Sequence, residues 1–241
     1  LTNQGDTVTS FQSNHLGIGS VYIQASAGVS YHAVLDSLAD HAMVISAQYP
    51  LPLPVDRGHT LAIKQADQDI KLFIHTNKST EDSLFIRVSC RGDLYYILKT
   101  TSQNKQIRAS LPKNTLPEGI ILFTLLDQEM RPIAERLFFN ERLDTRLSIQ
   151  ASTDRSGYAK RSKTDIHIQV SGKEGLSTEA QLSLMAVGSD HIGKEPLSRQ
   201  NILTHFLLQS ELRGEVEEPN YYFQGDTAAR SRAIDALLLT Q

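Results

Sequence analysis

The feature of this sequence that most constrains its fold is a period-two alternation of apolar and polar side chains, repeated in short runs over the first two thirds of the chain. Ile70, Leu72 and Ile74, for example, alternate with Lys71 and His75. Because successive side chains of a strand point to opposite faces of a sheet, such runs predict half-buried strands. Turn signals separate the runs, which favours antiparallel sheets packed as a sandwich.

The predicted strands extend well beyond this example. Further runs lie at 21–24, 31–35, 84–90, 107–111, 133–139, 147–149, 166–170 and 182–187. Residues 120–126 are apolar at nearly every position, which predicts a central strand covered on both faces. The predicted fold class is therefore all-β, with tandem immunoglobulin-like antiparallel β-sandwiches and short helices in the C-terminal part.

Composition and turn residues suggest three domains. Residues 49–54 contain three alternating prolines, which cannot donate ladder hydrogen bonds, so we expect an extended linker or an edge there. We expect residues 50–141 to form one complete sandwich. We expect residues 1–49 to be the C-terminal part of another sandwich, because they contain too few strand patterns to form both of its sheets. Residues 142–241 are predicted to form a second sandwich with helical segments at about 198–212 and 226–240, where apolar residues recur at helical spacing.

Both ends of the chain carry apolar residues without an evident partner. Val21 and Ile23 lie in the incomplete N-terminal part, and the last predicted helix finishes on Leu237, Leu238 and Leu239. We therefore expect the sequence to be a fragment of a longer protein, with strand edges in 1–49 that pair with a neighbouring molecule or are unusually mobile. A signal peptide is then either cleaved or outside this piece.

Composition excludes several classes of protein. The 241 residues carry 24 Lys plus Arg against 27 Asp plus Glu, a formal net charge of −3. This small and mixed charge does not give the basic face of a nucleic-acid-binding protein. No apolar run approaches the roughly 18 residues that a membrane-spanning helix needs.

Motifs that carry chemistry are missing from the sequence. It contains no GxSxG elbow, no P-loop and no HExxH motif. Gly17–Ser20 reads as a turn that enters the 21–24 strand, and Cys90 as a buried thiol on a strand face. The histidines have no metal-ligand spacing; they are His15, His32, His41, His59, His75, His167, His191 and His205. We assign no catalytic, cofactor-binding or metal-ligating residue, and binding residues stay unknown.

One cluster of carboxylate and tyrosine side chains is a candidate ligand site. Glu215, Glu217 and Glu218, followed by Tyr221 and Tyr222, could form a calcium or glycan site. No spacing rule singles this cluster out, so we favour a solvated turn whose tyrosines pack on a neighbouring domain.

Further candidates are two carboxylates and four tyrosines. Asp154 and Asp165 flank a strand, as turn residues do, and are not predicted to be a catalytic pair. A row of exposed aromatic side chains on one sheet face would indicate a carbohydrate-binding module. The candidates for such a row, each of which alternates with apolar neighbours, are Tyr22, Tyr31, Tyr95 and Tyr96.

Several strings resemble macroglobulin-type (MG) domains. Residues 17–34 are similar to the closing strands of such a domain. Residues 116–127 followed by 132–140 match the ending LP-x-G-Φ…D…P-x-A-E-R-L-x-F. Residues 207–214 with 218–223 are similar to a segment of long exported Bacteroidetes proteins, in which alpha-2-macroglobulin-like sandwiches occur in series. Carboxypeptidase-regulatory-like or TonB-receptor plug domains often accompany them.

The resemblance implies export to the periplasm or the outer membrane. It implies a non-enzymatic structural or interaction module with protein partners at the cell envelope, and no cofactor. The thioester motif C-G-E-Q of protease-trapping macroglobulins does not occur here, and Cys90 lies in a strand pattern. The alternatives are a carbohydrate- or ligand-binding module that serves a TonB-dependent uptake system, and an enzyme whose site assembles from scattered residues.

Overall fold

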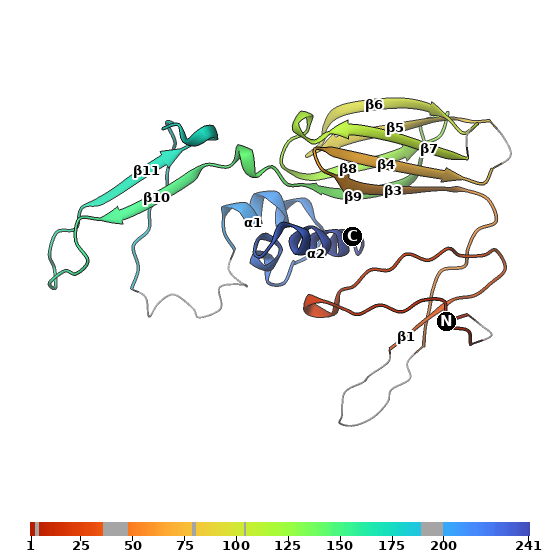
Figure 1. Cartoon of the computed structure of the whole chain (residues 1–241), viewed down its shortest axis with the longest axis horizontal. Coiled ribbons are helices and arrows are strands. Elements are labelled where there is room, and N and C mark those ends of the chain that lie inside the picture. Colours follow the sequence, from red (N-terminus) through yellow and green to blue (C-terminus); the bar gives the residue numbers. More distant parts are fainter. Residues whose placement is uncertain (3–4, 36–47, 79–80, 104, 189–199) are drawn as a thin grey trace, which may run out of the picture.

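Figure 1 shows the computed structural model of the chain, which describes residues 1–2, 5–35, 48–78, 81–103, 105–188 and 200–241. The strands are β1 (His32–Val34), β2 (Gln48–Pro50), β3 (His59–Ala66), β4 (Asp69–Thr76), β5 (Ser83–Cys90), β6 (Asp93–Thr101), β7 (Gln106–Pro112), β8 (Gly119–Leu126), β9 (Pro132–Asn140), β10 (Ser148–Thr153) and β11 (Ile166–Ser171). The helices are α1 (Ile202–Leu207) and α2 (Thr227–Leu238). The 3-10 turns are η1 (His15–Gly17), η2 (Lys113–Thr115), η3 (Leu143–Thr145), η4 (Lys173–Gly175), η6 (Gln209–Glu211) and η7 (Pro219–Phe223).

Strands β3 to β9 form two antiparallel sheets around one core, and we call them the two-sheet body (Figure 1). One sheet has the order β3-β4-β7 and the other β6-β5-β8-β9. Both sheets contribute buried side chains, such as Ile70 and Leu72 from the first and Ile86 and Phe123 from the second. A predominantly β chain with antiparallel sheets is thus confirmed, whereas the division into three domains stays a prediction.

Strand β8 is the central strand that the apolar run at 120–126 predicted. It lies between β5 and β9. Ile121, Phe123 and Leu125 enter the core between the sheets. On its other face Ile120 belongs to a second core, which the C-terminal helices cover. Both faces are therefore shielded from water, which explains why this strand lacks the usual alternation.

The second core attaches the C-terminal helices to the outside of the four-stranded sheet. Leu208 and Leu237 pack there with Ile120 and Phe139 of the sheet. In Figure 1 the two helices lie against the two-sheet body on the side of β9. This arrangement leaves the C-terminal helices as a covering layer of the sheet.

The helix ends follow from local capping. The Asn201 side chain accepts hydrogen bonds from the backbone N–H groups of Leu203 and Thr204, which starts α1. The Asp226 carboxylate accepts one from the Ala229 N–H at 2.9 Å, which starts α2. Helix α1 lies within the predicted segment 198–212, of which residues 198–199 are outside the described part, and α2 lies within 226–240.

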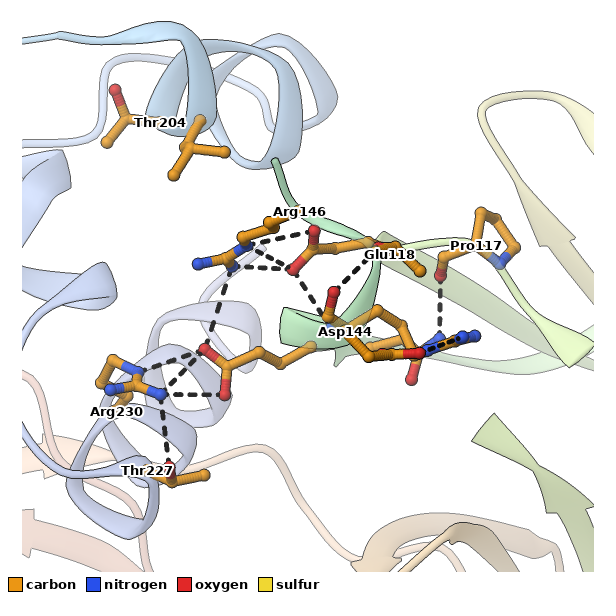
Figure 2. A network of polar contacts seen from close by, with 12 residues as sticks. Pro117, Glu118, Asp144, Arg146, Thr204, Thr227 and Arg230 are labelled. Carbon is orange, nitrogen blue, oxygen red and sulfur yellow. Dashed lines mark hydrogen bonds and ion pairs between the residues drawn. The ribbon is translucent and has the colours of Figure 1, made fainter. Parts of the chain in front are cut away.

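A polar network connects the two-sheet body to the segments that follow it (Figure 2). The Glu118 carboxylate accepts bonds from Arg146 Nη2 at 2.7 Å and Nε at 3.0 Å, and from the Arg142 backbone N–H at 3.1 Å. Glu141, the residue after β9, pairs with Arg230 of α2 at 3.1 Å. Arg146 Nη2 also lies 3.9 Å from Glu141, so one chain of charges joins the β7–β8 loop, the stretch before β10 and α2.

The LPEG turn before β8 needs its glycine. Gly119 has a φ of +126°, which L side chains rarely adopt. A Cβ atom there would lie 2.6 Å from Arg91 Nη2, which donates to the Glu118 carbonyl at 2.9 Å. Asn140 is buried across from this turn, and its amide donates to the Pro117 carbonyl at 2.8 Å. These contacts explain physically why the string at 116–120 contains a glycine.

Two predicted strands are wrong. Residues 21–24 and 182–187 are irregular, and their apolar side chains are exposed. Strand conformation requires a neighbouring ladder to satisfy backbone N–H and C=O groups, and neither segment has one within the described residues. The N-terminal part instead has the two-stranded sheet β1-β2, and Pro50 ends its exposed strand β2 as expected for an edge.

Helices long and apolar enough to span a bilayer do not occur among the described residues.

His59, at the start of β3, makes the stability of the fold depend on pH. Both ring nitrogens are buried without a hydrogen-bond partner. Burial, and next the nearby Lys78 charge, lower the pKa of His59 below its ordinary value of 6.5. The unfolded chain therefore binds the proton more readily, so stability is full above about pH 6.5 and falls as the pH drops below it.

We predict that H59F removes part of this acid sensitivity. Urea unfolding of the parent chain is expected to show a midpoint that falls between neutral pH and pH values below 6.5. H59F is expected to show a shallower fall, because Phe carries no titrating ring. Equal slopes for the two proteins would contradict the assignment.

Candidate interaction surface

The hairpin β10–β11 is amphipathic, with one apolar and one polar face. In its antiparallel register Ile149 lies opposite Val170, and Ala151 opposite Ile168. Thr153 and Ile166 pair next along the same face. Directly opposed residues of an antiparallel pair share a face, so this face carries only Ile, Val, Ala and Thr. The other face is uniformly polar and consists of Ser148, Gln150, Ser152, His167, Gln169 and Ser171.

The apolar face of this hairpin is open to solvent. Ile149 is 56% exposed and Ile168 38% exposed, and both strands are exposed along most of their length. Figure 1 shows the hairpin projecting away from the two-sheet body. Full burial of an Ile side chain contributes about 1.5–3 kcal/mol of stabilisation. A partner that covered the three exposed Ile residues would therefore gain substantial binding free energy. We call Ile149, Ala151, Thr153, Ile166, Ile168 and Val170 the hairpin apolar face.

Polar contacts hold both ends of the hairpin. At its tip, Asp154 accepts hydrogen bonds from the Tyr158 hydroxyl and from the Asp165 backbone N–H. The Tyr158 contact is the main cause that lowers the pKa of Asp154. At its base, Arg146 is paired with Glu118 of the two-sheet body. Asp154 and Asp165 are therefore loop residues, as expected. The ion pair between Arg146 and Glu118 attaches the base of the hairpin to the two-sheet body.

More apolar side chains lie exposed beyond the hairpin. Leu184 is 63% and Met185 80% exposed, and Leu182 and Val187 are exposed as well. Large apolar side chains that are exposed together often mark an interaction site. The segment that follows the hairpin thus adds to the apolar surface of this part of the chain.

The Glu and Tyr cluster forms an internal contact. Tyr222 is buried in the second core, and this burial raises the pKa of its phenol. The Tyr221 ring stacks on the His15 ring at a centroid distance of 3.6 Å. His15 Nε2 lies 2.9 Å from a Glu218 carboxylate oxygen but lacks hydrogen-bond geometry, so the two groups are close neighbours without a hydrogen bond between them. The tyrosines therefore pack against the N-terminal segment.

The other sequence candidates do not assemble. Tyr31 is buried and its hydroxyl accepts a bond from the Ser26 N–H at 2.9 Å. Tyr95 and Tyr96 are neighbours in β6 and so point to opposite faces. Tyr22 lies in the irregular N-terminal stretch, so the four tyrosines make no row.

The cysteine and histidine candidates do not form a site either. Cys90 is buried in the core, as predicted, and burial raises the pKa of its thiol. In the described part of the chain no three His, Cys, Asp or Glu side chains could hold a metal ion together. His41 and His191 lie outside the described residues.

Comparison with family models, with curated proteins and with solved structures gives no match to this chain. Sequence reasoning did not identify the hairpin apolar face, although the alternation at 147–149 and 166–170 was recognised as two strands. The signal that could have found it is the pairing of those two runs with each other, which puts all their apolar residues on one face.

Proposed function

We propose that the chain is a non-enzymatic interaction module of an exported cell-envelope protein, built from tandem immunoglobulin-like sandwiches of the macroglobulin type. The hairpin apolar face is its docking surface, and its occupant is the apolar face of a second β-sheet. The strings at 116–127 with 132–140, and at 207–214 with 218–223, support the macroglobulin-type and envelope parts. The missing catalytic motifs support the non-enzymatic part, and turnover on a peptide or glycan substrate would contradict it.

The exposed hairpin apolar face is the observation that carries the docking role. Isolated two-stranded hairpins are marginally stable in water and usually need packing against another element. Its three Ile residues and Val170 point to one side, and no Lys, Arg, Asp or Glu lies on either face. A second sheet that packs face to face would bury these side chains as in a sandwich. In a solution of the chain alone, the matching surface is the same face of a second copy.

A charge placed on the apolar face should abolish this association. We predict that the parent chain forms dimers as its concentration rises and that I149K/I168K stays monomeric, because docking would bury two unpaired ammonium groups. Sedimentation equilibrium measures the mass. Ile149 and Ile168 are exposed, so the urea midpoint should change little.

The matched control is Q150K/Q169K. Gln150 and Gln169 lie directly opposite each other on the polar face of the same hairpin. This variant adds the same charge but leaves the docking face intact, so it is expected to dimerise like the parent. A parent chain that is monomeric throughout, or a control that is as monomeric as I149K/I168K, would refute the proposal.

A further inference from the structure

The outer face of the sheet β3-β4-β7 gathers positive charge. Lys64 of β3 lies directly opposite Lys71 of β4, and Lys71 is paired with Ser110 of β7. Arg108 of β7 lies opposite Phe73 of β4, one pair further along the same face. Lys64, Lys71 and Arg108 are all exposed. We call these three cations with Phe73 the cationic face.

This charge is not neutralised within the described residues. No ion pair joins Lys64, Lys71 or Arg108 to a carboxylate there. The carboxylate on this face of the three strands is Asp69, at its end, which accepts a hydrogen bond from Ser110 Oγ at 2.8 Å. Like charges directly opposite each other on neighbouring strands destabilise a sheet. Repulsion between Lys64 and Lys71 therefore destabilises the sheet, and a bound polyanion would reduce this repulsion.

Aromatic rings stand next to these cations. Lys64 Nζ lies 5.6 Å from the centroid of the Tyr22 ring and 6.0 Å from that of Phe73. Tyr22 is 72% exposed, so its ring is available to a ligand beside the cations. Flat rings offer packing surface to the C–H faces of sugar rings, and the cations offer pairing to sugar carboxylates.

We propose that the cationic face binds an acidic polysaccharide that carries carboxylate groups along its chain. Each exposed ion pair is individually weak because water screens it, so a single small anion would bind weakly. A polymer engages several cations at once and gains from effective concentration. The exposed Tyr22 ring beside the cations favours a sugar polymer over an acidic peptide. This site is distinct from the hairpin apolar face and does not depend on it.

The experiment uses polygalacturonate as the acidic glycan and dextran as the neutral one, with the whole chain in affinity electrophoresis. The parent is expected to be retarded by polygalacturonate and not by dextran, and less so at higher salt. K64Q/K71Q is expected to bind roughly tenfold more weakly. Its urea midpoint should be equal to or above that of the parent, because a like-charge pair is lost. The urea midpoint therefore distinguishes a variant that no longer binds from a variant that no longer folds.

The matched control is K99Q, because Lys99 also places its Nζ 5.7 Å from an aromatic ring, that of Phe85, but on the other sheet. It is expected to bind polygalacturonate like the parent. Equal retardation of the parent and K64Q/K71Q would overturn the proposal. So would equal or tighter binding of poly-L-glutamate or of a single-stranded oligonucleotide, which would assign the face to another class of polyanion. The self-association of the chain should be unchanged in K64Q/K71Q, so the two sites can fail separately.

Discussion

F123A is expected to cost the chain about 3–5 kcal/mol of unfolding free energy, the largest single loss that we predict. Phe123 is fully buried on the central strand β8. Its ring meets that of Phe138 edge to face at a centroid distance of 6.5 Å. Truncation removes the transfer energy of the ring and leaves a cavity between two sheets that can close only in part. Domains are typically stable by about 5–15 kcal/mol, so this loss is severe.

Urea denaturation followed by far-UV circular dichroism measures this loss. The matched control is Y95A, because Tyr95 lies on β6 of the same sheet but is partly exposed. We expect Y95A to lower the midpoint much less than F123A. Equal losses for the two variants would mean that the core does not lie between the two sheets as described.

E118A is expected to lower the unfolding free energy by about 2–4 kcal/mol. Glu118 and Arg146 are mostly buried, with side-chain exposures of 11% and 20%. Removal of the carboxylate leaves the Arg146 guanidinium with Glu141 at 3.9 Å as its remaining acidic neighbour. The cost therefore comes mainly from a buried charge that has lost its partner. Hydrogen exchange is expected to speed up around residues 142–147, at the base of the hairpin.

A solvent-exposed ion pair is the control. Arg131 donates to Asp127 at 2.8 Å, nearly the distance of the buried pair, but its side chain is 72% exposed. R131A is expected to leave the urea midpoint almost unchanged, because water screens such pairs. A double-mutant cycle of E118A with R146A should show a combined loss smaller than the sum of the single losses. A midpoint for E118A that equals that of R131A would show that the network does not support the fold.

The candidate sites differ in how far sequence could predict them. The alternation of Ile166, Ile168 and Val170 is local, so the strand β11 and its apolar side were foreseeable. Which strand pairs with it, and whether a second sheet covers it, depends on partners distant in the sequence. The cationic face was missed for the same reason, because Lys64 and Arg108 come from strands that only the sheet order brings together.

The sequence by itself determined the strands β4, β5, β7 and β9 and the fully apolar strand β8, because each depends on side chains within a few residues of one another. The tertiary structure alone decided which alternating runs became strands. Runs 21–24 and 182–187 have the same local pattern as β10 but no partner ladder in the described residues, so they stay irregular. Contacts such as Glu118 with Arg146, or His15 with Tyr221, join residues far apart in the chain. The periodicity of the sequence cannot predict these contacts, because they form only when the packed sheets and helices bring those segments together.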